Sequence, residues 1–406
     1  MSDKKLIQEI SILTATQAAG QILNLVALVF LARFLGDSDF GMIQVCVAIM
    51  SYALIISEAG LFAVGSRAVA RLSKLSDISS HVSSQLSLMM VLAVAIFAFS
   101  ILPVQFFSPD NINKTVLLIY MAVTLPQAGM LDWLGIAMGK SITVGISRLV
   151  KASVYLLLIL LILPKNQNLN LVPVFLIISM IAGNIVMRVQ SWRWLGCCPK
   201  PSINNFSASK ELIKQTAPIG ASNLVQRVLF NFDIIIIGMI ATTSDAGVYA
   251  AAAKLLFVLI VAVETGLSAV LPKLSQLWQD DKTEFDISVR RYLKILLFCL
   301  MPLPVIGFLF AEPVIGLIYG EQYLNAIPIF KILSLAYPIL SVVLFFGTVL
   351  VASDRQKRWF AVTVVGAITA IVALSLLVPN AGITGAALAM LISYIVSLLV
   401  VVRKAT

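Results

Sequence analysis

Twelve apolar segments, each long enough to cross a lipid bilayer, recur along this chain of 406 residues. A membrane-spanning helix needs about 20 consecutive apolar residues. Only 12% of the residues are charged, whereas a soluble domain has roughly 25%. The sequence therefore predicts an all-α polytopic membrane protein. The expected spans are residues 10–34, 41–65, 80–102, 114–138, 142–163, 171–190, 213–239, 247–270, 292–312, 327–351, 358–378 and 383–402.

The basic residues are distributed unevenly between the two sides of this predicted membrane protein. If the N-terminus with Lys4 and Lys5 is cytoplasmic, the segments on that side hold 21 of the 29 Lys and Arg residues. The opposite linkers hold Lys114 and Lys165, with Arg33 at a helix end. Cytoplasmic loops carry an excess of Lys and Arg. The pattern predicts two cytoplasmic termini, and it attributes the net charge of +10 to membrane topology rather than to nucleic-acid binding.

A stretch near the start of the chain recurs 206 positions later. In residues 38–64 and 244–270, 8 of 27 aligned positions are identical, and they cluster at the two ends. Internal duplication is a signature of transporters built from two pseudo-symmetric halves. We therefore expect an N-terminal six-helix bundle at residues 1–190, a cytoplasmic linker at 191–212, and a C-terminal six-helix bundle at 213–406.

Nine charged residues lie inside the predicted spans when the residues at or near the span ends are left out. A charge at the bilayer centre costs roughly 2.5–3.5 kcal/mol on the most lenient scale, so such residues face a water-filled cavity or one another. Structural ion pairing, for example of Lys254 or Arg227 with Asp233, is the alternative to ligand binding. The cations are Arg148, Lys151, Arg227, Lys254 and Lys331, and the acids are Glu58, Asp132, Asp233 and Glu264.

Three of these cations favour an anionic ligand. Arg148 and Lys151 are three residues apart and share one helix face, where they repel each other unless an anion lies between them. Both could instead extend to the nearby membrane surface. Arg227 lies near the middle of its span, and its planar guanidinium suits a phosphate group.

The first predicted helix of each half carries a polar stripe. Gln17, Gln21 and Asn24 fall on one face of the first span. Gln17 and Gln21 correspond to Asn223 and Arg227 under the 206-residue shift, and Asn231 extends the second stripe. We expect both stripes to line a shared cavity. Hydrogen bonding that only joins helices is the alternative.

The sequence contains no motif for ATP hydrolysis or covalent catalysis. The patterns GxxxxGK[ST], GxSxG and HExxH are all absent,. The four cysteines lack the spacing of metal ligands. We therefore expect that the protein is not an enzyme and that it binds no metal and no other cofactor. Its transport could be coupled to a proton or sodium gradient.

Several short motifs resemble those of the polysaccharide transporters of the multidrug/oligosaccharidyl-lipid/polysaccharide (MOP) exporter superfamily, in particular the O-antigen flippases. The likeness covers the whole chain. The motifs are RFLGDSDFG at 33–41, EAGL at 58–61 leading into Arg67 and Arg71, YGEQYLNA at 319–326 and GITGAA at 382–387.

The resemblance implies a MATE-like fold and a flippase of the bacterial inner membrane. Such a protein moves an undecaprenyl-pyrophosphate-linked oligosaccharide from the cytoplasmic to the periplasmic leaflet by alternating access, through a cationic cavity between two bundles. Its partners would be that substrate, membrane lipids and the glycan polymerase and chain-length machinery. The five cations and the two polar stripes would bind substrate, and the four acids would couple ions or hold the cations in place.

Three other functions fit a polytopic membrane protein. A cation-coupled multidrug exporter of the same superfamily would be expected to have an excess of acids in its cavity, whereas basic residues are in excess here. A glycan polymerase or ligase would be expected to have a large extracytoplasmic loop, whereas the predicted loops are short. A purely structural scaffold would not need charges inside its spans.

Overall fold

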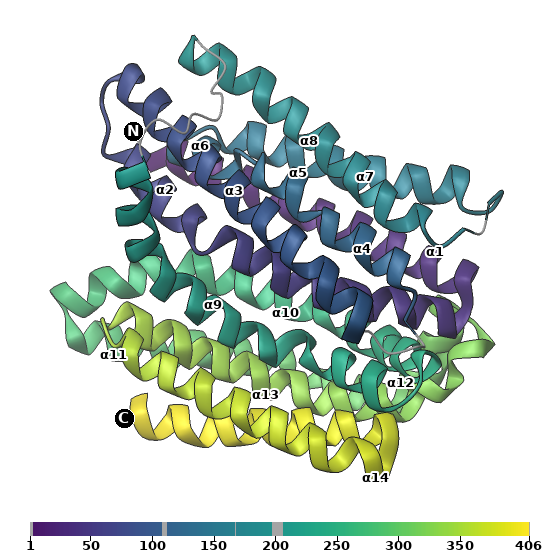
Figure 1. The fold of residues 1–406 in the computed structure, drawn as a ribbon. Helices are drawn as coiled ribbons and strands as arrows, with labels where there is room; N and C mark the ends of the chain where they lie inside the picture. Colours follow the sequence, from purple (N-terminus) through teal and green to yellow (C-terminus); the bar gives the residue numbers. More distant parts are fainter. Residues whose placement is uncertain (1–2, 108–111, 167, 197–205, 406) are drawn as a thin grey trace. The chain divides into compact units, whose positions relative to one another are not determined.

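The computed structural model describes residues 3–107, 112–166, 168–196 and 206–405. These residues form helices throughout, with no strand among them, which confirms the all-α prediction (Figure 1). The elements are α1 (Asp3–Glu58), α2 (Leu61–Ala70), α3 (Leu75–Phe107), α4 (Lys114–Ala122), α5 (Thr124–Ala128), α6 (Asp132–Ala137), α7 (Ser141–Ile162), α8 (Leu171–Leu195), α9 (Phe206–Ile240), α10 (Thr243–Asp280), α11 (Lys282–Leu300), α12 (Pro302–Tyr319), η1 (Glu321–Ala326), α13 (Ile327–Ala352) and α14 (Gln356–Ala405).

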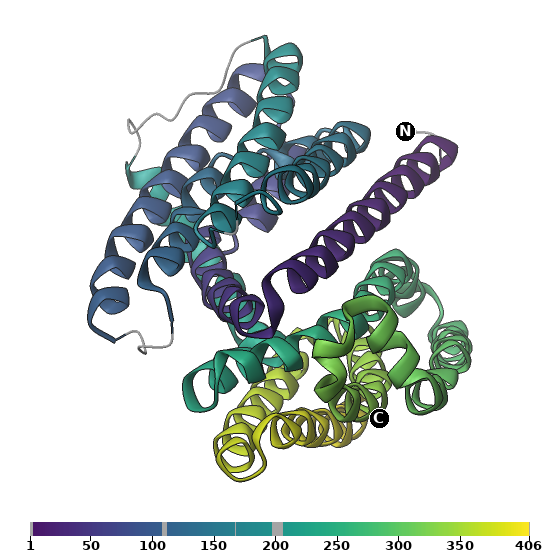
Figure 2. The same ribbon diagram turned by 90° about the vertical axis from the view of Figure 1, so that its right-hand side faces the viewer.

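Along the described ranges, nine segments are long and apolar enough to span a membrane, and the bent helix α9 makes a tenth. This number differs from the twelve predicted spans because two segments each contain a pair of spans joined at a glycine. Gly36 in α1 has φ +78° and Gly382 in α14 has φ +55°. Glycine adopts such values without steric cost, so the helix axis turns there; Figure 2 shows α1, in purple, changing direction.

The predicted span 114–138 is divided into the three short helices α4, α5 and α6. Pro126 lies in this stretch, and proline cannot donate the backbone hydrogen bond that a continuous helix needs. The break ends at Asp132, the first residue of α6, whose side chain is only 2% exposed. The sequence predicted a single span here, and the structure shows that the span is interrupted where a charged residue is placed.

The chain divides into two compact units. The first comprises residues 1–34 and 46–224, and the second comprises residues 35–45 and 225–406. In the first unit, α7 packs along α8, and α3 packs against α4 and α5. In the second, α13 packs against α10, α12 and α14. The predicted bundle boundaries at 190 and 213 stay a prediction, and residues 197–205 of the predicted linker lie outside the described residues.

The two copies of the duplicated turn contact each other within the second unit. A side chain added at Gly41 would meet the carbonyl of Thr243 and the backbone of Gly247, and one added at Gly247 would meet the carbonyl of Asp37. Ser38 Oγ lies 3.1 Å from Thr243 Oγ1, and Ser244 Oγ donates to Asp37 Oδ2. The glycines in the repeat therefore allow two helices to cross with their backbones in contact.

Substituting Gly41 with alanine is expected to destabilise the protein. The added methyl group has no space at this crossing, and overpacking typically costs about 1–3 kcal/mol. Thermal unfolding of the detergent-solubilised protein measures the effect. Gly266→Ala on α10 is the matched control because a Cβ there has no atom within 4 Å. Equal unfolding temperatures for the two variants would contradict the described crossing.

Candidate functional site

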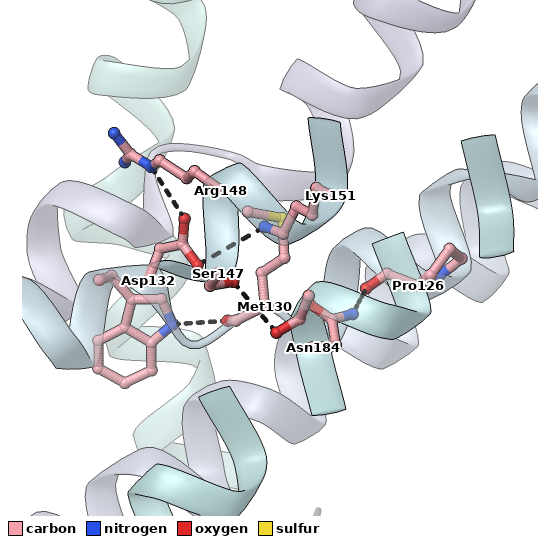
Figure 3. Close-up of polar contacts among 9 residues, drawn as sticks. Pro126, Met130, Asp132, Ser147, Arg148, Lys151 and Asn184 are labelled. Atoms are coloured by element: carbon pink, nitrogen blue, oxygen red, sulfur yellow. Dashed lines mark hydrogen bonds and ion pairs between the residues drawn. The ribbon is translucent and has the colours of Figure 1, made fainter. Parts of the chain in front are cut away.

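A buried carboxylate in the first unit lies between two cations of α7. Arg148 Nε is 3.2 Å from Asp132 Oδ2, and Lys151 Nζ is 3.6 Å from Asp132 Oδ1 (Figure 3). Arg148 and Lys151 share the side chain of Asp132, whereas the anionic ligand expected between them stays a prediction. Two basic side chains thus share one acidic side chain, so the group has one more basic than acidic residue.

The break between α5 and α6 is held in place by side chains from α8 and from α6 itself. Asn184 Nδ2 donates to the carbonyl of Pro126 at 2.6 Å, and Trp133 Nε1 donates to the carbonyl of Met130 at 3.1 Å (Figure 3). The Pro126 carbonyl also accepts from the backbone N–H of Gly129 at 3.1 Å, so Asn184 adds a second bond to a carbonyl of α5,. These bonds fix the position from which Asp132 reaches α7.

The position of α7 is also fixed from α8. Ser147 Oγ donates to the carbonyl of Gly183 at 3.1 Å. The aliphatic part of Lys151 occupies the space that a side chain at position 183 would fill. The side chain of Lys151 is therefore held along α8, with its ammonium group directed at Asp132.

These cations open onto a cavity of about 340 Å³ in the first unit. The predicted polar stripe of α1 forms one wall, and Arg148 Nη1 donates to Gln17 Oε1 at 3.4 Å. The full lining is Gln17, Gly20, Gln21, Asn24, Arg148, Lys151, Ala152, Tyr155, Leu176, Ser179 and Met180. No carboxylate is among these residues, so the charged groups that line the cavity are both cations, beside amides and the apolar side chains of Ala152, Leu176 and Met180. Such a surface suits an anionic group with hydrogen-bonding oxygens.

The second unit contains a separate charged group around Lys254 of α10. Lys254 Nζ donates to Asn231 Oδ1 at 2.9 Å and lies 5.7 Å from the ring centroid of Phe257. Asp233 and Arg227 both act electrostatically on Lys254. The Lys254 ammonium donates its hydrogen bond to the Asn231 amide oxygen, and the alternative expected from the sequence, an ion pair of Lys254 with Asp233, stays a prediction.

Asp233 is held mainly by tyrosine. The Tyr249 hydroxyl donates to Asp233 Oδ2 at 2.7 Å, and the backbone N–H of Ile234 donates to Oδ1 at 2.8 Å. Tyr337 lies close by, with its hydroxyl donating to the carbonyl of Ala253 at 3.3 Å. Sequence reasoning did not identify these tyrosines, because an aromatic residue inside an apolar span gives no sign of which polar group it contacts.

Arg227 also interacts electrostatically with Glu264 of α10. The helix α9 bends by 56° between Val228 and Phe230. Arg227 and Asn231 therefore lie on opposite sides of the bend, and the predicted second stripe is not one continuous helix face. Asn223, at its start, has an exposed side chain.

Two other predicted site residues lie away from these groups. Lys331 of α13 packs over Phe308 of α12, with Nζ 6.0 Å from the ring centroid. Glu58 is the last residue of α1, before the turn at Ala59 and Gly60, both with positive φ. The roles predicted for both residues stay predictions.

The sequence profile of a family described as "Polysaccharide biosynthesis protein" matches residues 6–278, and that of the MatE family matches residues 218–376. The first match covers more than half of the chain. The chain belongs to the polysaccharide biosynthesis protein family. It is 24% identical over 259 residues to the capsular polysaccharide biosynthesis protein CapF of Staphylococcus aureus. This alignment covers 63% of the chain and 65% of the length of CapF.

Solved structures show the same fold. The inward closed conformation of the lipid II flippase MurJ superposes with a TM-score of 0.77 at 14% identity, covering 97% of this chain and 87% of that one. An inward-facing multidrug resistance MATE family transporter of the MOP superfamily superposes with a TM-score of 0.76 at 12% identity, covering 95% and 93%. The protein is a multi-pass membrane protein with the MOP fold, as its motifs predicted.

Proposed function

We propose that this protein is a flippase that moves an undecaprenyl-pyrophosphate-linked oligosaccharide, an O-antigen or similar repeat unit, from the cytoplasmic to the periplasmic leaflet. The observation that carries the proposal is the cavity of the first unit, where two cations share one carboxylate. The family, and the likeness to CapF and MurJ, support a lipid-linked glycan as the substrate.

The pyrophosphate would contact Arg148 and Lys151 from the cavity side, and Gln17, Gln21 and Asn24 would bind its oxygens. Asp132 keeps the two cations close together before the substrate arrives. Arg227 and Lys254 would form a second cationic position. In this proposal the protein works by alternating access in the bacterial inner membrane, with both termini cytoplasmic, and proton or sodium coupling uses the acids Glu58, Asp132, Asp233 or Glu264.

Titration of the purified protein with inorganic pyrophosphate tests whether the cavity of the first unit binds an anion. A charge-assisted hydrogen bond contributes about 1.5–3 kcal/mol, so replacing both Arg148 and Lys151 with glutamine should weaken binding by at least tenfold. Lys165→Gln, in an exposed turn, is the control. Unchanged affinity in the double variant would contradict the assignment of this cavity.

The match to the MatE profile and the fold similarity to a MATE transporter favour a second candidate, a multidrug exporter. The same titration, repeated with the organic cation tetraphenylphosphonium, separates the two functions. A flippase of this kind should bind pyrophosphate and leave tetraphenylphosphonium unbound. Binding of the organic cation alone would support the exporter.

A further inference from the structure

The second unit has its own cavity, of about 260 Å³, where α9, α10, α13 and α14 approach one another. Its polar lining consists of Gln226, Glu264, Ser268 and Thr348, and its aromatic lining is Trp359. Pockets for drug-sized ligands measure about 300–1,000 Å³, so this one suits a smaller group. Arg227 directly follows the lining residue Gln226 in the sequence, and it acts electrostatically on Glu264.

The indole of Trp359 is fixed where it lines this cavity. Its six-membered ring lies over the backbone of Gly347, where a Cβ would approach ring carbons to 2.7 Å. Trp359 also packs against a buried apolar cluster that includes Val343, Val362 and Val401. An aromatic side chain held in one position provides a flat apolar surface for a ligand at little entropic cost.

The polar groups around the indole can form hydrogen bonds with the hydroxyl groups of a ligand. Ser268 Oγ donates to the carbonyl of Thr265 at 2.7 Å, and Thr348 Oγ1 donates to the carbonyl of Leu344 at 3.0 Å. Both hydroxyl oxygens therefore present acceptor lone pairs to the cavity, and the Glu264 carboxylate adds more. The Gln226 amide can donate as well as accept.

The charge of this cavity favours a neutral ligand over a cation. Among the residues that line this cavity, only Glu264 has a carboxylate. That carboxylate interacts electrostatically with Arg227. The positive charge of Arg227 offsets the negative charge of Glu264, so the cavity offers an organic cation little net attraction. A pyranose ring, which is neutral, has hydroxyl donors at its edge and an apolar C–H face that stacks on an indole.

We propose that this cavity binds a neutral sugar ring of the transported glycan, stacked on Trp359 and hydrogen-bonded to Gln226, Glu264, Ser268 and Thr348. The assignment rests on the flippase function proposed above. It gives the second unit a sugar-binding site of its own, in addition to the anion-binding site proposed for the first unit's cavity.

Saturation-transfer NMR on the purified protein tests this site with glucose, galactose, mannose and N-acetylglucosamine as probes. The wild-type protein should transfer saturation to the C–H protons of at least one of these sugars. Trp359→Ala should reduce that transfer at least fivefold, whereas Trp359→Phe should retain most of it. Trp192→Ala is the matched control, because this tryptophan is 60% exposed on α8 of the other unit.

Gly347→Ala provides a variant that keeps Trp359 and the four polar lining residues but moves the indole. Its methyl group displaces the indole, so transfer should fall even though Glu264 and Thr348 are unchanged; thermal unfolding confirms that the variant is folded. Absence of Trp359-dependent transfer to all four sugars would overturn the proposal, as would Trp359-dependent transfer to tetraphenylphosphonium alone. The free sugars need no lipid and no gradient, so this result is independent of the pyrophosphate titration.

Discussion

Replacing Asp132 with asparagine is expected to lower the free energy of unfolding by about 3–5 kcal/mol. The carboxylate is buried, with 2% of its side chain exposed, and both Arg148 and Lys151 depend on it. Removing one member of a buried ionic group leaves the others as uncompensated charges in a medium that solvates them poorly. Chemical denaturation of the protein in detergent micelles gives the change in stability.

A compensating variant tests whether the effect comes from charge rather than from packing. Replacing Asp132 with leucine together with methionine at positions 148 and 151 removes all three charges, and this variant should regain most of the lost stability. Apolar residues of similar volume often replace a buried ionic group at little or no cost. If Asp132→Asn unfolds at the same denaturant concentration as the wild type, the ionic group has no structural role.

Replacing Arg227 with alanine is expected to abolish export of the surface glycan, with a reduction of more than tenfold at normal protein levels. Arg227 acts electrostatically on both Lys254 and Glu264, so its removal weakens the second cationic position. Loss of a charge-assisted hydrogen bond of about 1.5–3 kcal/mol accounts for a tenfold or larger effect. The measurement is surface glycan in cells whose export depends on this protein, with membrane levels checked by immunoblot.

Two further variants separate binding by Arg227 from its interaction with Glu264. Arg227→Lys keeps the positive charge and should retain part of the export. The double variant Arg227→Gln and Glu264→Gln removes both charges, and it should stay as inactive as Arg227→Ala if the guanidinium binds substrate. Wild-type export by well-expressed Arg227→Ala protein would contradict the role of this residue.

Much of the first unit's cavity follows from helical spacing alone. Gln17, Gln21 and Asn24 are three and four residues apart, so they had to share a face of α1, and the structure places that face along the cavity. Arg148 and Lys151 share a face of α7 for the same reason. Spacing along one helix is a local property, and for this reason it can be inferred without tertiary contacts.

Contacts between helices were less accessible to sequence analysis. Asp132 precedes Arg148 by 16 residues, and the two residues lie on different helices. Asp132 reaches α7 only because the helix that precedes it is interrupted. The repeat showed that Gly41 and Gly247 are equivalent, but equivalence does not imply that the two glycines contact each other. The cavity beside Trp359 depends on four helices, and its residues are spread over more than 130 positions from Gln226 to Trp359.

The most direct test of the central claim is movement of a lipid-linked sugar between leaflets. The purified protein is reconstituted into liposomes with a fluorescent undecaprenyl-pyrophosphate oligosaccharide, and the label in the outer leaflet is measured with a membrane-impermeant quencher. The flippase function predicts that label redistributes between leaflets with the wild-type protein, and much more slowly with the Arg148→Gln and Lys151→Gln double variant. Redistribution no faster than in protein-free liposomes, or equally fast with both proteins, would contradict it.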